Sequence, residues 1–320
     1  NKCDIKARKC VAASSCKAIK LNGDSAKKHD LVFVGADFKD YDDLEKAAKI
    51  LLDYEGNFQT RLVVFSLTPF KENLGKFNFW MVLAPDYPHY EVESPIKGVG
   101  PDTIYLPDEA YYESFVQNCE RYTVVVISPY LFRSFAKFPT TGGSGGLVYL
   151  SLQNPLKGPE YLGRSLAHEL GHAIGGLADE YVEYGSSDLT QTGDYPNCAP
   201  DLKEAQRKWG DLVGARGVHY YTGISGIAGT TYYKSLEPTF PELGLFPDGS
   251  DWGDGGCSYV RKNIRPTQNS IMKSNYDLEN DFGPVNERVL NEKFIGYDRQ
   301  DQQVLEPMGV RGRRFIEDRG

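Results

Sequence analysis

The feature that most constrains this chain is the segment His168-Glu169-Leu170-Gly171-His172, which has the form H-E-x-x-H. In a helix, residues four apart lie one turn from each other on the same face, so His168 and His172 can offer two imidazole nitrogens to one metal ion. Glu169 would then project beside the ion. A metal site that activates water also needs a third protein ligand, an open position and a base for the proton.

The residues around this segment favour a helix with one buried face. Apolar side chains recur at helical spacing at positions 162, 166, 170 and 174, and Gly175-Gly176 then predicts the end of the helix. Two glycines leave the chain free to turn back and to present an acidic residue, Asp179 or Glu180. The alternative is a surface helix with scattered polar residues, and the apolar spacing argues against it.

Composition and charge exclude several classes of protein. The 320 residues can bury a large core, and no apolar run approaches the length of a membrane span. A net charge of −8 argues against a general nucleic-acid binder. Six cysteines with no C-x-x-C pair favour three disulfides and a secreted or extracytoplasmic protein, the alternative being six reduced thiols in a cytosolic one.

The positions of the cysteines suggest how they pair. Cys198 and Cys257 both follow the His168–His172 helix and precede Met272, so we expect them to bond to each other. The remaining four would tie the Lys-rich N-terminal segment to the region of Cys119. Residues 1–27 are therefore expected to be an extension that disulfides attach to the fold, with a solvated basic tail as the alternative.

Strands and helices alternate before residue 130, which indicates a mostly parallel sheet. Continuous apolar or β-branched runs predict strands, and 3.6-residue periodicity predicts helices. The predicted strands are 31–34, 61–67, 76–83 and 123–127, and the predicted helices are 42–53 and 111–121.

A glycine-rich stretch, residues 140–146, leads into another predicted strand at 147–152. It lacks the G-K-[ST] ending of a phosphate loop, and a strand follows it in place of a helix. We expect this strand to lie at an edge near the site, where it could pair with an extended substrate, with a plain connecting loop as the alternative. Residues 182–260 show little periodicity and are expected to be loops that shape a cleft wall.

Met272 lies in the segment Arg265–Tyr276, and residues 285–295 predict a closing helix. A methionine on a tight turn beneath the metal ligands accompanies the long H-E-x-x-H motif in metzincin peptidases. Met272 is therefore a candidate for such a Met-turn. Tyr276, four residues later, is a candidate to donate a hydrogen bond to an oxyanion, the alternative being a packed core aromatic.

The strings HELGHAIGGLADEY and RPTQNSIM, with the GGSGG-strand between residues 142 and 152, resemble the IgA-peptidase-type family of zinc metallopeptidases. The looser strings TPFKENLGKFNFW and PVNERVL extend the resemblance over most of residues 28–297. It implies an α+β, metzincin-like zincin fold. In that fold a twisted mixed, mostly parallel sheet lies above the active-site helix, and the lower half is irregular and loop-rich. It also implies one catalytic Zn²⁺ and cleavage of peptide bonds.

The resemblance also assigns the third ligand. The usual metzincin spacing would place it at Ala178, which cannot bind zinc. The resembled family carries the same L-x-D-E-Y ending, so the resemblance implies Asp179, with Glu180 as the alternative and His219 as a more distant one. His29 and His89 are expected to be ordinary surface or core residues.

These expectations define a zinc-dependent endopeptidase with Glu169 as general base, a protein or peptide substrate and a monomeric state. We expect an N-terminal extension at 1–27, a catalytic domain at 28–300 with halves 28–178 and 179–300, and a polar tail at 301–320. Two other functions remain open. One is a zinc amidase acting on non-protein amides, and the other is a secreted binding protein with a vestigial zinc site.

Overall fold

The computed structural model describes most residues from 16 to 295 and two short segments before them. The described ranges are 2–4, 9–11, 16–56, 61–84, 89–93, 103–107, 115–116, 119, 123–130, 132, 134–138, 146–153, 161–181, 194–225, 231–235, 243–246, 256–258, 260 and 263–295. The glycine-rich residues 140–145 and the tail 301–320 lie outside them.

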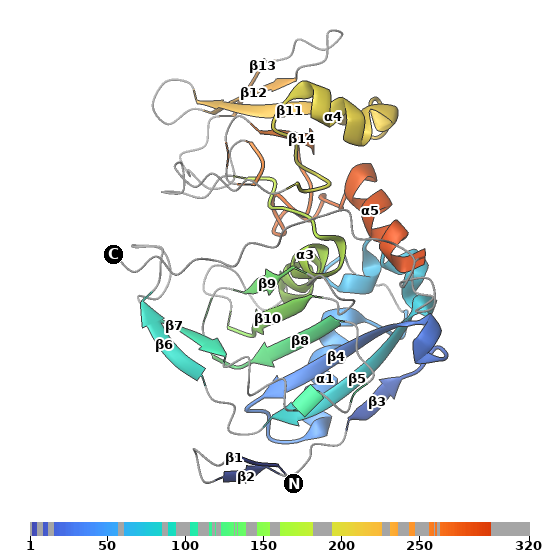
Figure 1. Ribbon diagram of the computed structural model, residues 1–320, viewed down its shortest axis with the longest axis vertical. Coiled ribbons are helices and arrows are strands. Elements are labelled where there is room, and N and C mark those ends of the chain that lie inside the picture. Colours follow the sequence, from blue (N-terminus) through green and yellow to red (C-terminus); the bar gives the residue numbers. More distant parts are fainter. Residues whose placement is uncertain are drawn as a thin grey trace.

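A six-stranded sheet in the order β3-β5-β4-β8-β10-β9 forms the base of the fold (Figure 1). Its four central strands are parallel, and the two edge strands run antiparallel to their neighbours. The strands are β3 (Lys17–Lys20), β4 (His29–Ala36), β5 (Phe77–Ala84), β8 (Thr123–Ser128), β9 (Phe135–Lys137) and β10 (Leu147–Ser151). The mostly parallel α+β architecture expected from the alternation of elements is confirmed.

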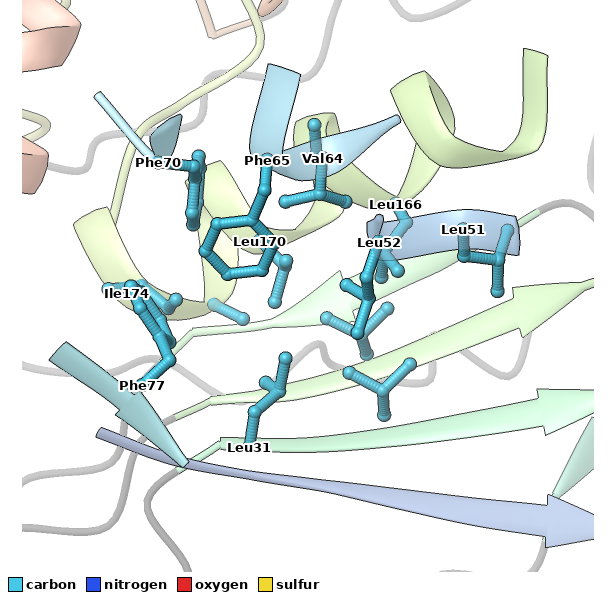
Figure 2. Packing of buried hydrophobic residues seen from close by; sticks show 14 of the residues in the cluster. Leu31, Leu51, Leu52, Val64, Phe65, Phe70, Phe77, Leu166, Leu170 and Ile174 are labelled. Carbon is cyan, nitrogen blue, oxygen red and sulfur yellow. The ribbon is translucent and has the colours of Figure 1, made fainter. Parts of the chain in front are cut away.

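Both faces of this sheet are covered, which explains why its central strands read as continuous apolar runs. Leu31 of β4 faces a core that it shares with the helices α1 (Tyr41–Leu52) and α3 (Leu162–Gly175) (Figure 2). Phe33 belongs to the same core. Val32 and Val34 face the opposite side, where they pack with Phe115 and Cys119. The helix predicted at 42–53 is thus confirmed as α1. Every residue of α3 is buried.

Two predictions in this half need correction. The apolar run 61–67 was expected to be a strand, but it is a turn followed by the 3₁₀ helix η2 (Val64–Ser66). Val64 and Phe65 still fill the core beside α3, since a tight turn can bury the same apolar residues as a strand (Figure 2). The strand after the glycine-rich loop, β10, is not an edge, because β8 and β9 flank it and β9 takes the edge.

Of the helix predicted at 111–121, the structure describes residues 115, 116 and 119, and residues 115–116 are helical. The smaller elements of the chain are the strand pairs β1 (Lys2–Asp4) with β2 (Lys9–Val11) and β6 (His89–Glu93) with β7 (Thr103–Pro107), and the 3₁₀ helices η1 (Ser25–Lys27), η3 (Lys71–Lys76) and η5 (Gly210–Leu212).

The second half of the chain contains more regular structure than its sequence suggested. A four-stranded antiparallel sheet, in the order β13-β12-β11-β14, lies beyond α3 together with α4 (Leu202–Trp209) (Figure 1). Its strands are β11 (Val218–Ser225), β12 (Thr231–Ser235), β13 (Leu243–Phe246) and β14 (Ile264–Thr267). The expectation of loops throughout residues 182–260 was therefore wrong. Tyr and Thr supply β-propensity without an obvious apolar alternation. The closing helix is confirmed as α5 (Pro284–Ile295).

Two disulfides tie these elements together. Cys16–Cys119 links the start of the sheet to its far face, and Cys198–Cys257 joins two segments near α3, as the cysteine positions predicted. Cys3 lies opposite Cys10 in the β1–β2 pair. In the part of the chain that the structure describes, no helix has both the length and the apolar character to cross a membrane.

Candidate metal centre

Three side chains converge at the C-terminal end of α3. Nε2 of His168 lies 3.2 Å from Nε2 of His172, and Oδ1 of Asp179 lies 3.1 Å from the first and 3.3 Å from the second. The three ligating atoms therefore form a nearly equilateral triangle. Ligands of a tetrahedral zinc ion, at 2.0–2.1 Å from the metal, would be about 3.3 Å apart. The triangle thus has the dimensions that a tetrahedral ion requires.

The Nδ1 atoms of both imidazoles are hydrogen-bonded to backbone carbonyls. Nδ1 of His168 lies 2.9 Å from the carbonyl oxygen of Ile271, and Nδ1 of His172 lies 2.6 Å from that of Leu177. A carbonyl oxygen only accepts, so each Nδ1 carries a proton, and each imidazole in its neutral form turns the lone pair of Nε2 toward Asp179. Two lone pairs and a carboxylate facing one another at this distance repel unless a cation lies between them. The donor set therefore fits a divalent metal.

The charges at this cluster are strongly coupled. Burial by itself lowers the pKa of His172, but the Asp179 carboxylate outweighs it and raises that pKa to about 9. Burial likewise opposes ionisation of Asp179, yet the two imidazoles hold its pKa well below the ordinary value. A bound cation would take the place of the extra proton that this geometry otherwise favours.

Glu169 lies beside this triangle. Ligating atoms of His168, Glu169 and His172 all lie within 4.8 Å of one another, and the three residues are buried. Because Glu169 follows His168 directly, its side chain points about 100° around the helix from the two histidines. It is therefore adjacent to the triangle without closing it.

The end of α3 delivers Asp179. Gly176 adopts the left-handed conformation, with φ of 62°, and its N–H caps the carbonyls of Gly171 and His172. A left-handed residue at this position reverses the chain and favours glycine. Gly175 is closely packed, since a Cβ there would lie 3.0 Å from Leu177 and 3.1 Å from Leu290. The end of the helix predicted from the glycine pair is therefore provided by Gly176, while Gly175 is still the last residue of α3.

The segment around Met272 forms the floor beneath the histidines. Met272 is fully buried, and a Cβ built on Gly171 would lie only 2.6 Å from its Sδ. The glycine within the H-E-x-x-H motif therefore allows Met272 to approach α3. The same turn orients the ligands through its backbone, because Ile271 accepts from His168 and the Met272 carbonyl accepts from the N–H of Glu180 at 3.0 Å.

Glu180, the alternative third ligand, is turned away from the triangle. It is fully buried, and four side chains donate to its carboxylate: Thr267, Ser270, Asn197 and Asn286. The closest is Ser270 Oγ, at 2.7 Å from Oε2. Burial raises the pKa of Glu180 above its ordinary value. Its carboxylate connects α5 and β14 to the segment that carries Asp179.

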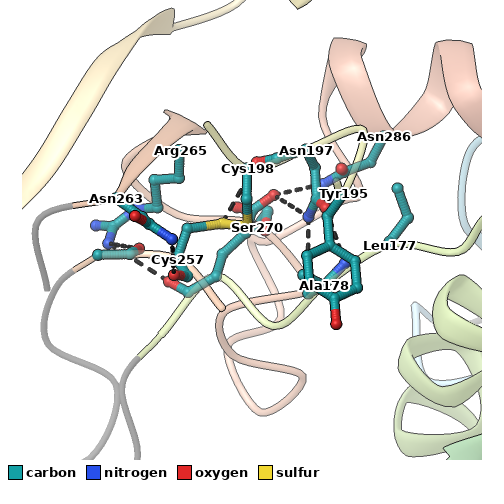
Figure 3. Close-up of a disulfide and its surroundings, with 12 residues drawn as sticks. Leu177, Ala178, Tyr195, Asn197, Cys198, Cys257, Asn263, Arg265, Ser270 and Asn286 are labelled. Atoms are coloured by element: carbon teal, nitrogen blue, oxygen red, sulfur yellow. Dashed lines mark hydrogen bonds between the residues drawn. A yellow bond between two sulfur atoms is a disulfide. The ribbon is translucent and has the colours of Figure 1, made fainter. Parts of the chain in front are cut away.

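Asn197 and Arg265 are further parts of the site that sequence reasoning missed (Figure 3). The amide of Asn197 forms hydrogen bonds to both the N–H and the carbonyl of Ala178. Arg265 is buried and donates to four backbone carbonyls, one of them that of Glu180. No local pattern marks either residue. The one available signal was the position of Asn197 directly before a cysteine expected to be bonded.

Arg164, in the first turn of α3, was also missed. Its guanidinium is buried and donates to the carbonyls of Arg61, Asn275, Asp277 and Asn280 at 2.6–3.0 Å. Burial lowers the pKa of Arg164. Three of those carbonyls belong to the chain that follows Met272, so Arg164 fastens this chain to the helix that carries the histidines.

The structure also describes the surroundings of Tyr276, His219 and His29. Tyr276 is half-buried, and its ring packs on Tyr161, the residue that precedes α3 and lies nearly two turns before His168. His219, the distant alternative ligand, lies in β11 with its ring against Tyr221. His29 is a core residue, as expected: it is fully buried, its Nε2 lies 3.0 Å from Thr123 Oγ1, and burial lowers its pKa to about 3.

One family of known proteins matches the part of the chain that carries this site. The family described as IgA Peptidase M64 matches residues 18–220, which include α3, Asp179 and Asn197 and end before Met272. Among curated proteins, none matches this chain. The matched residues make up well over half of the sequence and carry the two histidines and the acidic residue that face one another. The chain therefore belongs to the IgA peptidase M64 family, a family of peptidases.

Proposed function

We propose that this protein is a secreted, zinc-dependent endopeptidase in which His168, His172 and Asp179 hold the ion. The observation that carries this proposal is the triangle of ligating atoms, with edges of 3.1–3.3 Å and with both Nδ1 atoms committed to backbone carbonyls. Three protein ligands leave one corner of a tetrahedron for water, which is the arrangement of catalytic zinc sites. The two disulfides suit an oxidising compartment.

When bound, the zinc would supply Lewis-acid activation of the water and of the scissile carbonyl. Glu169 acts as general base: its carboxylate takes a proton from the attacking water and returns it to the amine nitrogen that leaves. Its position supports this role, because its carboxylate lies within 4.8 Å of the ligating nitrogens of both histidines, and a general base must lie close to the water that it deprotonates. Asp179 keeps its negative charge and offsets that of the metal.

The substrate is expected to bind along β9. This strand is the edge of the sheet in place of β10, so the substrate-pairing role suggested for the strand after the glycine-rich loop moves to its neighbour. Phe138 follows β9 directly, and its ring lies edge-on to His172 with centroids 5.8 Å apart. An extended peptide paired with the outer edge of β9 would therefore pass the metal ligands.

The test is a peptide-library digest by the full chain, with and without a chelator, read by mass spectrometry. We expect chelation to abolish cleavage and zinc to restore it. Glu169→Gln should bind zinc as the wild type does and should lose at least ~100-fold in turnover, since positioned general bases typically contribute 10²–10⁴. Retained turnover in Glu169→Gln would remove it as the base.

Two adjacent acids provide a matched pair for the metal ligand. Asp179→Ala should lose zinc, measured by metal analysis of the purified protein, whereas Glu180→Gln should keep it. If Glu180→Gln lost zinc and Asp179→Ala retained it, the ligand assignment would be reversed. Zinc-dependent cleavage of small amides without cleavage of peptides would instead indicate an amidase, and absence of any zinc-dependent hydrolysis would indicate a vestigial site.

A further inference from the structure

The segment that carries Asp179 is a loop whose position depends on contacts made by its backbone. Residues 178–181 follow the left-handed Gly176 and belong to no helix or strand. The N–H of Ser258 donates to the carbonyl of Asp179 at 2.7 Å, and the N–H of Glu180 donates to that of Met272 at 3.0 Å. A carboxylate on such a loop holds an ion only as firmly as these contacts hold the loop.

The side chain of Asn197 makes three hydrogen bonds with this segment. Its Oδ1 accepts from the N–H of Ala178 at 2.8 Å, and its Nδ2 donates to the carbonyl of Ala178 at 2.9 Å. Nδ2 also donates to Oε1 of Glu180 at 3.1 Å. One fully buried amide therefore holds the residue before Asp179 and the residue after it, and Figure 3 shows it between the loop and the disulfide.

The position of Asn197 is in turn set by its neighbours. The adjacent Cys198 is bonded to Cys257, and both sulfurs are buried against Ala178. Lys208 of α4 donates to the carbonyls of Tyr195 and Cys198, on either side of Asn197. The disulfide thus joins the segment that carries Asn197 to the segment that carries Ser258, and each of these segments is hydrogen-bonded to the Asp179 loop.

We propose that Asn197 is a positioning residue for Asp179, and that Asn197 and the Cys198–Cys257 disulfide together set the affinity of the site for its metal. This inference rests on the proposed function and adds to it a determinant of metal retention that touches neither metal nor substrate. Loss of the amide, or of the disulfide beside it, allows the Asp179 carboxylate to leave the triangle while the two histidines stay on α3.

The chain offers a closely matched control for the amide. Asn78 is also fully buried, and its side chain also makes three hydrogen bonds: it accepts from Asn22 N–H and donates to Gly23 and to the Asp30 carboxylate. It lies in β5, outside the metal cluster. Asn78→Ala and Asn197→Ala therefore remove equivalent sets of bonds, and only the second set holds the Asp179 loop.

The measurement is the dissociation constant for zinc alone, from competition with a coloured chelator, with thermal unfolding in excess chelator as the readout of stability. We expect both variants to lower the unfolding temperature of the metal-free protein. Asn197→Ala should weaken zinc binding about 10–100-fold, as loss of a residue that orients a ligand typically does, and Asn78→Ala should change it less than about twofold. Equal effects on zinc affinity, or no effect of Asn197→Ala, would overturn the proposal.

Paired disulfide variants keep the test decisive if Asn197→Ala does not fold. Cys198→Ser/Cys257→Ser should weaken zinc binding, whereas Cys16→Ser/Cys119→Ser should not, although the second pair closes the longer loop, with a sequence separation of 103 against 59. Equal zinc affinities for the two pairs would contradict the inference. If the wild type bound no zinc, the proposed function would fail first; if Asp179→Ala lost zinc and Asn197→Ala did not, only this inference would fail.

Discussion

Gly171 lies between the two histidines, and replacing it with alanine should destabilise the protein although it improves the helix. Alanine in the interior of a helix is favoured over glycine by about 1 kcal/mol. Against this gain, the new Cβ would lie 2.6 Å from Met272 Sδ and 3.0 Å from Phe282 Cε1. Distances below 3 Å are not tolerated without movement of one partner.

The side chains around Gly171 indicate whether the cost of the clash exceeds the gain in helix propensity. Met272 and Phe282 are both fully buried, so neither side chain can move into solvent. Overpacking of a dense core typically costs 1–3 kcal/mol. Because both neighbours are enclosed in the core, the cost should lie toward the upper end, and after the gain in helix propensity the net loss should be about 1–2 kcal/mol. Zinc affinity should fall as well, because a displaced Met272 turn also moves the Ile271 carbonyl that orients His168.

The assay is urea unfolding with excess chelator, combined with zinc competition on the same variants. Gly175→Ala is the control within the same helix, since its Cβ would meet Leu177 and Leu290 at the milder distances of 3.0 and 3.1 Å. It should be less destabilising than Gly171→Ala. Adding Met272→Ala to Gly171→Ala should recover at least about 1 kcal/mol relative to additivity, because the double variant removes the clash. Stabilisation by Gly171→Ala, or strict additivity with Met272→Ala, would refute the reasoning.

Three further outcomes are expected. His29 has a pKa of about 3 in the folded protein and 6.5 unfolded, so the unfolded state binds its proton first and stability falls as pH drops below 6.5. The loss is about 3 kcal/mol at pH 4.5, and urea titrations of His29→Gln should lack this component. Arg164→Met leaves four backbone carbonyls without their buried donor and should cost about 3 kcal/mol or more, whereas Arg207→Met, on the exposed face of α4, should leave the stability almost unchanged; equal losses in calorimetry would contradict this difference. Chelation should lower the melting temperature of the wild type but not that of Asp179→Ala, since only a metal-binding folded state is stabilised by mass action.

Local sequence patterns were sufficient to predict the helices and strands whose burial follows a regular periodicity. The helix at 42–53 is bounded by Asp40, whose side chain accepts from the N–H of Asp43, and by a left-handed Asp53. Its buried residues, Leu44, Ala48, Leu51 and Leu52, lie on the face that packs into the core. The strand at 31–34 was evident because both of its faces are covered. In such elements, periodicity and caps act within a few residues and can be read directly.

In the segments that were assigned wrongly, the local sequence pattern does not specify the backbone conformation. Residues 61–67 are apolar because Val64 and Phe65 fill the core beside α3, and burial alone does not specify whether a strand or a turn supplies those side chains. The second sheet was missed because the stability of its tyrosine-rich strands comes from pairing between strands. The strands β11 and β14 pair although they lie some 45 residues apart, and this pairing produces no periodic pattern of apolar residues in either strand.

The sequence by itself determined the pair of imidazoles, because a four-residue spacing on a helix places two side chains on one face whatever surrounds them. It also determined that the chain turns after Gly175, since two glycines end a helix locally. Only the tertiary structure decided which side chains lie next to the two imidazoles. Asp179 faces the imidazoles, Glu180 faces away, and Asn197 and Met272 hold the intervening backbone, because each of these positions is set by hydrogen bonds and packing between segments that are far apart along the chain.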